Sequence, residues 1–130
     1  MNFTSRFAAT LVLPFAVLSL SASGCARKPA LSPEGAQVDV SRQSPAAGCQ
    51  SRGEVVGESG GSGIGGGRWV ANDKLIAYAM SDVRNRASAA GANYVQIDPP
   101  QLGSSHGTTS TVTITGAAYR CGQGMAVAQQ

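Results

Sequence analysis

The most regular pattern of apolar and polar positions runs from residue 74 to 90, in the segment KLIAYAMSDVRNRASAA. Its apolar residues recur every three or four positions, which places them on one face of a helix. This apolar stripe consists of Ile76, Met80, Val83, Ala87 and Ala90. Asn72 or Asp73 is suited to cap the start of the helix, and Gly91 can take the left-handed conformation that ends one. The pattern therefore predicts one amphipathic helix.

Two strands are predicted before this helix. The segment VDVSR, residues 38–42, alternates apolar and polar residues over a short length, as an edge strand does. The segment RGEVVGE, residues 52–58, indicates a second strand, in which Gly53 and Gly57 can mark bulges. Between this strand and the helix, the run SGGSGIGGG favours a flexible loop.

Two more strands are predicted after the helix. The segment NYVQID, residues 93–98, is a short strand that ends at a pair of prolines, and residues 101–110 indicate a polar surface loop. Residues 111–121 alternate well, with one side made of Val112, Ile114, Gly116 and Ala118. The order strand, strand, helix, strand, strand predicts an α+β fold. We expect a small, mostly antiparallel sheet with the helix packed on one face.

The first residues have the features of an export signal. Arg6 supplies a positive charge, residues 7–20 are apolar, and small residues follow. The apolar run is short for a membrane span, and Pro14 interrupts it, so a stable transmembrane helix is the less favoured alternative. The segment Ala22-Ser23-Gly24-Cys25 resembles the lipobox of bacterial lipoproteins, in which the cysteine is acylated. Ordinary secretion, with Cys25 left as a thiol, is the alternative.

These observations predict four segments along the chain. Residues 1–24 form the signal peptide, and residues 25–37, rich in proline and small residues, form the lipidated cysteine and a flexible tether. Residues 38–123 form one small α+β domain, and residues 124–130 a C-terminal tail. Removing the signal leaves 106 of the 130 residues, enough for a single domain with a modest core.

The chain has three cysteines, Cys25, Cys49 and Cys121, and an odd count in an exported protein requires an explanation. Acylation of Cys25 leaves the other two as a pair, which an oxidising compartment favours as a disulfide. We expect this disulfide to join two neighbouring strands. A catalytic redox pair is disfavoured, because neither cysteine stands in a C-x-x-C motif at a helix start.

Charge and glycine patterns argue against nucleic acid and nucleotides as partners. Without the signal, nine basic residues stand against seven acidic ones, which is too weak an excess to indicate nucleic acid. The pattern Gly61-x-Gly63-x-x-Gly66 is that of a dinucleotide loop, but the predicted helix starts several residues too late for one. A small-residue helix with glycine at every fourth position from Gly53 is also disfavoured, because glycine destabilises helices.

Three segments carry a resemblance to a known family: CQSRGEVVGES, AMSDVRNRASAAGANYVQID and GAAYRC. In this order and spacing they resemble the domain of unknown function 4156 family of small bacterial lipoproteins, over roughly residues 38–121. A more distant similarity, in architecture only, is to the Rcs-pathway outer-membrane sensor lipoprotein. Ala26, rather than aspartate, follows the lipobox cysteine, and this implies sorting to the outer membrane, facing the periplasm.

The expected function is that of a non-enzymatic, membrane-anchored contact or envelope-monitoring module. Its partners would be the membrane, through Cys25, and envelope proteins; no catalytic, cofactor-binding or metal-binding residue is expected. The expected contact surface consists of Ile64, Trp69 and Tyr78. The alternative is a periplasmic ligand- or glycan-binding module or small hydrolytic enzyme, which would use Arg84, Asn85, Asp98 and His106.

On the predicted helix, Asp82 and Arg86 lie one turn apart and are expected to form an ion pair.

Overall fold

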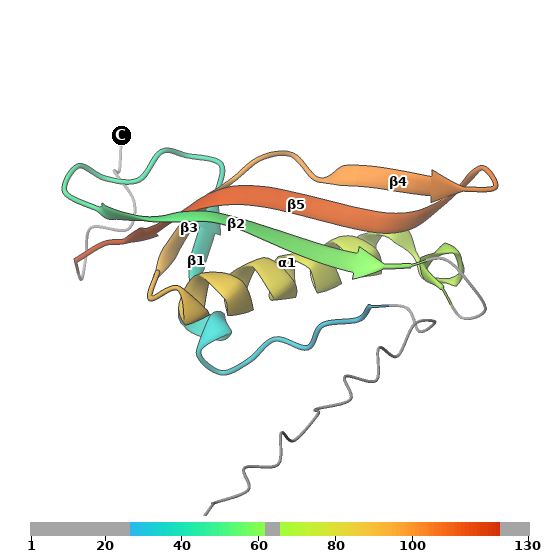
Figure 1. Cartoon of the computed structure of the whole chain (residues 1–130), viewed down its shortest axis with the longest axis horizontal. Coiled ribbons are helices and arrows are strands. Elements are labelled where there is room, and N and C mark those ends of the chain that lie inside the picture. Colours follow the sequence, from blue (N-terminus) through green and yellow to red (C-terminus); the bar gives the residue numbers. More distant parts are fainter. Residues whose placement is uncertain (1–26, 62–65, 123–130) are drawn as a thin grey trace, which may run out of the picture.

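The computed structural model describes residues 27–61 and 66–122. One helix lies across one face of a five-stranded sheet (Figure 1). The elements are the short helix η1 (Gly35–Gln37), β1 (Asp39–Ser41), β2 (Gln50–Gly60), the short helix η2 (Gly67–Trp69), α1 (Asn72–Ala89), β3 (Tyr94–Ile97), β4 (Gln101–Ser105) and β5 (Thr108–Arg120). The expected α+β class is confirmed. The expected signal peptide, Cys25, Ile64 and the C-terminal tail lie outside the described residues.

The long strand β5 organises the sheet. Along one edge it pairs antiparallel with β2, and along the other with β3 and then β4, which follow one another (Figure 1). The outer strand β1 pairs with β3 in parallel, so the sheet is mostly but not wholly antiparallel. As the alternation predicted, β5 buries its even-numbered residues from Ser110 to Ala118 against the core.

The predicted helix is confirmed, with two differences in detail. It begins at Asn72, and the residue before it, Ala71, has extended backbone angles and makes no side-chain cap, so the expected caps at Asn72 and Asp73 were wrong. At the other end, Gly91 has a φ of 77°, and its backbone N–H donates to Ser88, which ends the helix as expected.

The buried face of α1 is rotated by about one residue from the predicted stripe. Its fully buried residues are Leu75, Ala79, Val83 and Ala87. Ile76 and Met80 flank this face and are partly buried, and Ala90 is exposed. The small side chain of Ala79 allows the helix to lie close to the sheet. Ser59 reinforces the contact, since its hydroxyl donates to the backbone carbonyl of Leu75 at 2.6 Å.

The segment expected as a polar loop, residues 101–110, instead forms β4, the turn and the start of β5. His106 and Gly107 make the turn, with φ angles of 52° and 76°. Ser105 pairs with Thr108 on either side, so the two strands are joined by a two-residue hairpin. The sheet therefore has five strands, one more than the sequence predicted.

Gly53 and Gly57 of β2 are required to be glycine for different structural reasons. The register shifts between Ser51 and Gly53, where φ is 95°, so Gly53 marks a bulge as expected. Gly57 makes no bulge. A side chain there would collide with the backbone carbonyl of Ala79, so Gly57 allows the close approach of α1. Because residues 50–60 are a strand, the alternative of a glycine-rich helix is wrong over that range.

The expected disulfide between Cys49 and Cys121 is confirmed, with 4.3 Å between the two Cα atoms. It joins the start of β2 to the end of β5, next to the paired residues Gln50 and Arg120. The side chain of Asn93 holds the same end: its Nδ2 donates to the carbonyl of Cys121, and its Oδ1 accepts the backbone N–H of that residue, both at 2.8 Å.

Candidate functional site

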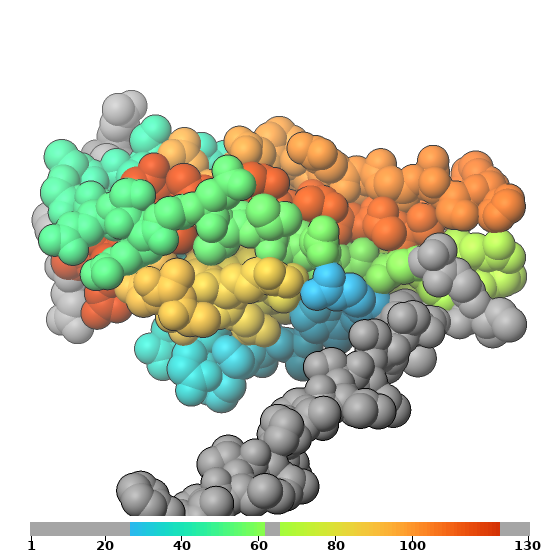
Figure 2. All heavy atoms as spheres, in the orientation of Figure 1, coloured from blue at the N-terminus to red at the C-terminus, as the bar shows by residue number. Residues whose placement is uncertain are grey.

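Residues 27–37, here called the strap, lie against the domain. The sequence predicted a flexible tether over residues 25–37, but the described part packs against α1 and the outer edge of β2. Figure 2 shows the strap in blue and cyan against these two elements. The strap is therefore part of the folded domain, which corrects the expectation for residues 27–37.

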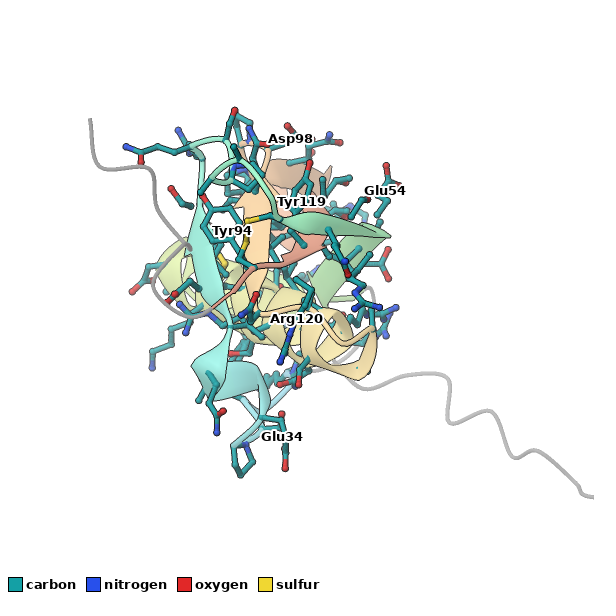
Figure 3. The ribbon with its side chains drawn as sticks, turned by 90° about the vertical axis from the view of Figure 1, so that its left-hand side faces the viewer. Glu34, Glu54, Tyr94, Asp98, Tyr119 and Arg120 are labelled. Carbon is teal, nitrogen blue, oxygen red and sulfur yellow. A yellow bond between two sulfur atoms is a disulfide. The ribbon has the colours of Figure 1, made fainter. Side chains whose placement is uncertain are left out.

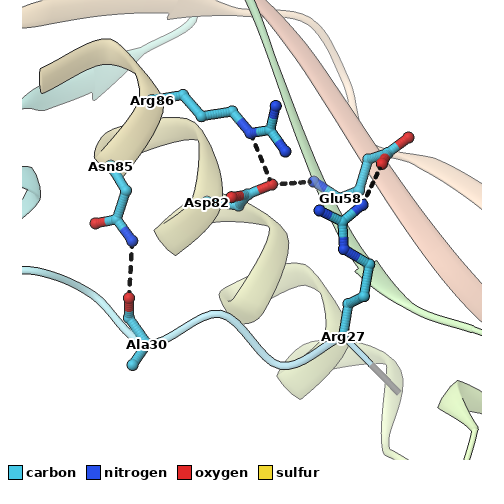
Figure 4. A network of polar contacts seen from close by, with 6 residues as sticks. All are labelled: Arg27, Ala30, Glu58, Asp82, Asn85 and Arg86. Carbon is cyan, nitrogen blue, oxygen red and sulfur yellow. Dashed lines mark hydrogen bonds and ion pairs between the residues drawn. The ribbon is translucent and has the colours of Figure 1, made fainter. Parts of the chain in front are cut away.

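Asn85 of α1 clamps the middle of the strap with both ends of its side-chain amide. Its Nδ2 donates to the backbone carbonyl of Ala30 at 2.8 Å (Figure 4), and its Oδ1 accepts the backbone N–H of Ser32 at 2.9 Å. Gly35 leaves room for this clamp, since a Cβ there would collide with Asn85 Oδ1. An amide is suited to this role because one side chain supplies both a donor and an acceptor.

Arg27, the first described residue, joins the edge of the sheet. Its backbone N–H donates to the carbonyl of Gly60 at 2.9 Å and its carbonyl accepts the N–H of Gly60 at 2.8 Å, as in a one-residue strand. Its side chain pairs with Glu58 at 2.7 Å (Figure 4). Both side chains are about half exposed, so we assign most of the positioning to the backbone bridge rather than to the ion pair.

Asp82 binds the same edge two residues earlier on β2. Its Oδ2 accepts the backbone N–H of Glu58 and the Nε of Arg86, each at 3.0 Å (Figure 4). The expected pair of Asp82 with Arg86 is confirmed. Unpaired edge strands invite association with other chains. Arg27 and Asp82 together occupy three of the outward-facing backbone groups of β2: the carbonyl and N–H of Gly60 and the N–H of Glu58.

Cys25 precedes Arg27 by two residues in the sequence, and two residues of extended chain span at most about 7 Å. Arg27 itself is held to Gly60 on the sheet.

The exposed Trp69 lies at the same end of the domain. It ends the short helix η2, and 70% of its surface is exposed. Gly67, two residues earlier, donates its N–H to the carbonyl of Gly61, the residue after the bridge partner of Arg27. The guanidinium of Arg68 lies over the indole ring, 4.7 Å from its centroid.

Of the two described residues of the expected contact surface, Trp69 is the exposed one. Tyr78 is partly buried on α1, and Ile64 lies outside the described residues. Trp69 and Tyr78 come from the consecutive elements η2 and α1. Trp69 is therefore the more accessible of these two described aromatic side chains.

The residues of the alternative ligand site do not converge. The N–H of Asp98 bonds to Thr115 of β5, and His106 lies in the turn before Thr108, seven residues further back along that strand. Seven residues of strand span roughly 23 Å. Asn85 is engaged with the strap on the helix side of the sheet.

Arg84, the fourth member of that set, lies beside Asn85 on α1 and does not join it in the clamp. Its Nε is buried and has no hydrogen-bond partner within the described part of the chain.

The described surface has open hollows at the disulfide end and on the sheet. One, of about 760 Å³, lies at the disulfide end and is lined by residues that include Glu34 and Arg120. The other, of about 470 Å³, lies on the sheet beside Glu54 and Asp98. Figure 3 shows Asp98 and Glu54 on one side of the molecule and Glu34 on the other. Across residues 27–61 and 66–122, no three histidine, cysteine or carboxylate side chains are grouped to hold a metal.

No helix within the described ranges is long and apolar enough to span a membrane. The fold and the strap define a class: a small α+β domain closed by one disulfide, whose N-terminal segment is clamped onto its helix and sheet edge. The chain belongs to the family described as Domain of unknown function (DUF4156), whose family model matches residues 29–121. The resemblance seen in the sequence is thus confirmed. No curated protein matches the chain.

The family match begins at residue 29, so it includes most of the strap as well as the sheet and helix. Sequence reasoning missed the strap. Asn85 was a signal for it, since an amide beside the apolar stripe of a helix is well placed to bind a neighbouring backbone. The partners are 53 and 55 residues away, and no local pattern identifies them.

Proposed function

We propose that the protein is a non-enzymatic lipoprotein of the bacterial cell envelope, anchored through acylated Cys25 to the periplasmic face of the outer membrane. Its domain would serve as a contact or envelope-monitoring module for other envelope proteins. The sequence supports the anchor through its apolar signal, its lipobox-like segment and Ala26 after the cysteine.

The observation that carries the proposal is the pairing of the cysteines. Cys49 and Cys121 are joined, so Cys25 is the one cysteine of the chain outside this pair. A disulfide in a domain of this size suits an oxidising compartment such as the periplasm. An odd cysteine that directly follows small residues and an apolar signal then has a chemical role as the acylated N-terminus.

A contact role is supported by how the polar residues are used. Asn85 and Asp82, the most distinctive polar residues of the helix, bind the strap and the edge of β2. Asp98 and His106, which a ligand-binding or hydrolytic site would need beside them, lie elsewhere on the sheet. No described feature favours the ligand-binding alternative over a contact role.

Lipidation is tested by expressing the full chain in a bacterial host. Globomycin, which blocks lipoprotein signal cleavage, should cause the precursor to accumulate, and Cys25→Ala should move the protein from the membrane to the soluble fraction. The double variant Cys49→Ser, Cys121→Ser is the matched control and should stay membrane-bound. Unchanged fractionation of Cys25→Ala, with no precursor in globomycin, would falsify the anchor.

The contact role is tested by crosslinking the lipidated protein in intact cells. We expect crosslinks to defined envelope proteins that are lost with Cys25→Ala. Recovery of glycan or peptidoglycan fragments with the purified domain, and no protein crosslinks, would support the ligand-binding alternative instead.

A further inference from the structure

The strap does more than complete the fold: it determines which end of the domain faces an anchor on Cys25. This inference rests on the proposed lipid anchor. Arg27 is bridged to Gly60, and only Ala26 separates it from Cys25. A flexible tether would let the domain tumble above the membrane. A bridged Arg27 instead holds one end of the domain next to the lipid.

Two neighbouring backbone contacts and the short helix η2 define this end. Gly60 carries the bridge to Arg27, the next residue Gly61 accepts the N–H of Gly67, and Gly67 begins the helix η2 that ends at Trp69. In Figure 1 the first described residues, in blue, and η2, in yellow-green, lie toward the same end of the molecule. We call this the anchor end. It consists of Arg27, Lys28, Arg68, Trp69 and Lys74.

The chemistry of the anchor end matches a membrane surface. All five of its side chains are exposed. The anchor end has four basic residues. Two acidic residues lie beside them: Glu58, which pairs with Arg27, and Asp73, which precedes Lys74. Exposed tryptophan is typical of the membrane interface, where the ring contacts the acyl boundary and its N–H stays among the headgroups. Basic side chains beside it favour anionic lipid.

We propose that the anchor end lies on the membrane that holds Cys25, with the indole of Trp69 in the headgroup layer and the basic side chains on anionic lipid headgroups. Arg68, stacked on the indole, extends the same contact. The opposite end of the domain, closed by the Cys49–Cys121 disulfide, faces away from the membrane.

Because the connection between Cys25 and Arg27 is short, a single exposed tryptophan is sufficient for contact with the membrane. One exposed aromatic ring binds a bilayer weakly when it is free in solution. Once Cys25 is in the bilayer, the second contact becomes intramolecular, and its effective concentration rises steeply as the linker shortens. Asn85 and the Arg27 bridge therefore act on membrane contact indirectly, because they keep the connection short.

Trp69 is the only tryptophan of the chain, so its fluorescence reports on this contact directly. The full lipidated protein is reconstituted into vesicles of phosphatidylethanolamine and phosphatidylglycerol, with and without brominated phospholipid, and acylation is verified by mass spectrometry. We expect emission shifted to shorter wavelength than for Cys25→Ser in solution, protection from acrylamide, and strong quenching by lipid brominated near the headgroups.

The decisive variant inserts a flexible Gly-Ser linker between Ala26 and Arg27. It leaves every described contact in place but lengthens the connection, so quenching by brominated lipid should fall while acylation is unchanged. Vesicles without phosphatidylglycerol should also show weaker quenching of the unmodified chain. Trp69→Phe should abolish the signal, which makes it the background control.

Trp69 emission that stays water-like in vesicles, in a protein that is acylated, would overturn this inference and leave the proposed anchor intact. So would quenching that does not change with the linker, or protection from acrylamide that appears only when envelope proteins are added. The last result would make Trp69 a protein contact. An unmodified Cys25 would instead contradict the proposed function, and the two failures are therefore distinguishable.

Discussion

Gly57 of β2 lies directly beneath Val83 of α1. A methyl group on Gly57 would be 2.5 Å from Val83 Cγ2 and 2.6 Å from its backbone nitrogen. These distances are well inside van der Waals contact, and Val83 is fully buried, so it has no open space to move into. Gly57→Ala should therefore push the helix from the sheet and lower the free energy of unfolding by about 1–3 kcal/mol.

Urea unfolding measures this effect, and Gly103→Ala is the matched control. A Cβ on Gly103 would meet chiefly the hydroxyl of Thr111, which can rotate away. The control should therefore change the unfolding midpoint much less. Equal losses at both positions would contradict the close contact of Gly57 with Val83.

The strap should come loose when its clamp is removed. Asn85→Ala deletes the hydrogen bonds to Ala30 and Ser32, and we expect it to lower the free energy of unfolding by about 1–2 kcal/mol. The specific readout is hydrogen exchange of the Ser32 amide, which should become fast. Proteolysis within residues 27–35 should also increase.

Asn93→Ala is the control for this clamp, because it removes two hydrogen bonds of the same kind at the disulfide end. It should lower stability while Ser32 exchange stays slow. Arg84→Ala, next to Asn85, should affect the strap little. Protection of Ser32 that survives Asn85→Ala would show that other contacts hold the strap.

How much of this arrangement the sequence predicts depends on the range of the interactions. The helix and β5 are identified because their apolar residues follow a local period. The strap is not, since Asn85 recognises backbone atoms more than fifty residues away. The composition of this segment also led to a wrong prediction. Residues rich in proline and small side chains were interpreted as a flexible tether, but the amide of Asn85 and the backbone bridge of Arg27 are enough to hold the strap on the domain.

The start of α1 shows a second limit. Asn72 and Asp73 are good capping residues, yet the helix already includes both, and Ala71 precedes it without a side-chain cap. The short helix η2 ends at Trp69, only three residues before Asn72, so the preceding chain sets where the helix begins. Local propensity identified the helix but placed its first residue one or two positions late.

The two hydrogen bonds of Asp82, to Arg86 and to the backbone N–H of Glu58, should contribute unequally to the free energy of unfolding. Arg86→Ala removes only an ion pair to a half-exposed guanidinium, so we expect a loss of at most about 0.5 kcal/mol. Asp82→Ala also leaves the N–H of Glu58 without its acceptor at the sheet edge, and should cost about 1 kcal/mol more. Thermal unfolding of both variants and of Asp82→Asn, which keeps an acceptor, measures the difference. Equal losses for Arg86→Ala and Asp82→Ala would contradict this assignment.

The disulfide should be a large single contributor to stability. It spans 72 residues of sequence, and loop closure of that length constrains the unfolded chain by roughly 4 kcal/mol. Cys49→Ser together with Cys121→Ser should therefore lower the free energy of unfolding by about this amount, as measured in urea. In the unreduced protein, neither cysteine should react with an alkylating reagent even after denaturation, and both should react once the disulfide is reduced. Rapid alkylation of both in the native protein would contradict the disulfide.

His106, the one histidine of the chain, has a conformational role in the β4–β5 turn. Both turn residues have positive φ, 52° at His106 and 76° at Gly107, which is the geometry of a type I′ turn. Asparagine before glycine suits this turn better than histidine, because Asn-Gly is one of the residue pairs that type I′ turns prefer. His106→Asn should therefore raise the unfolding midpoint slightly, by several tenths of a kcal/mol at most, and His106→Val should lower it. A loss of stability with asparagine would show that the imidazole makes a contribution beyond the turn.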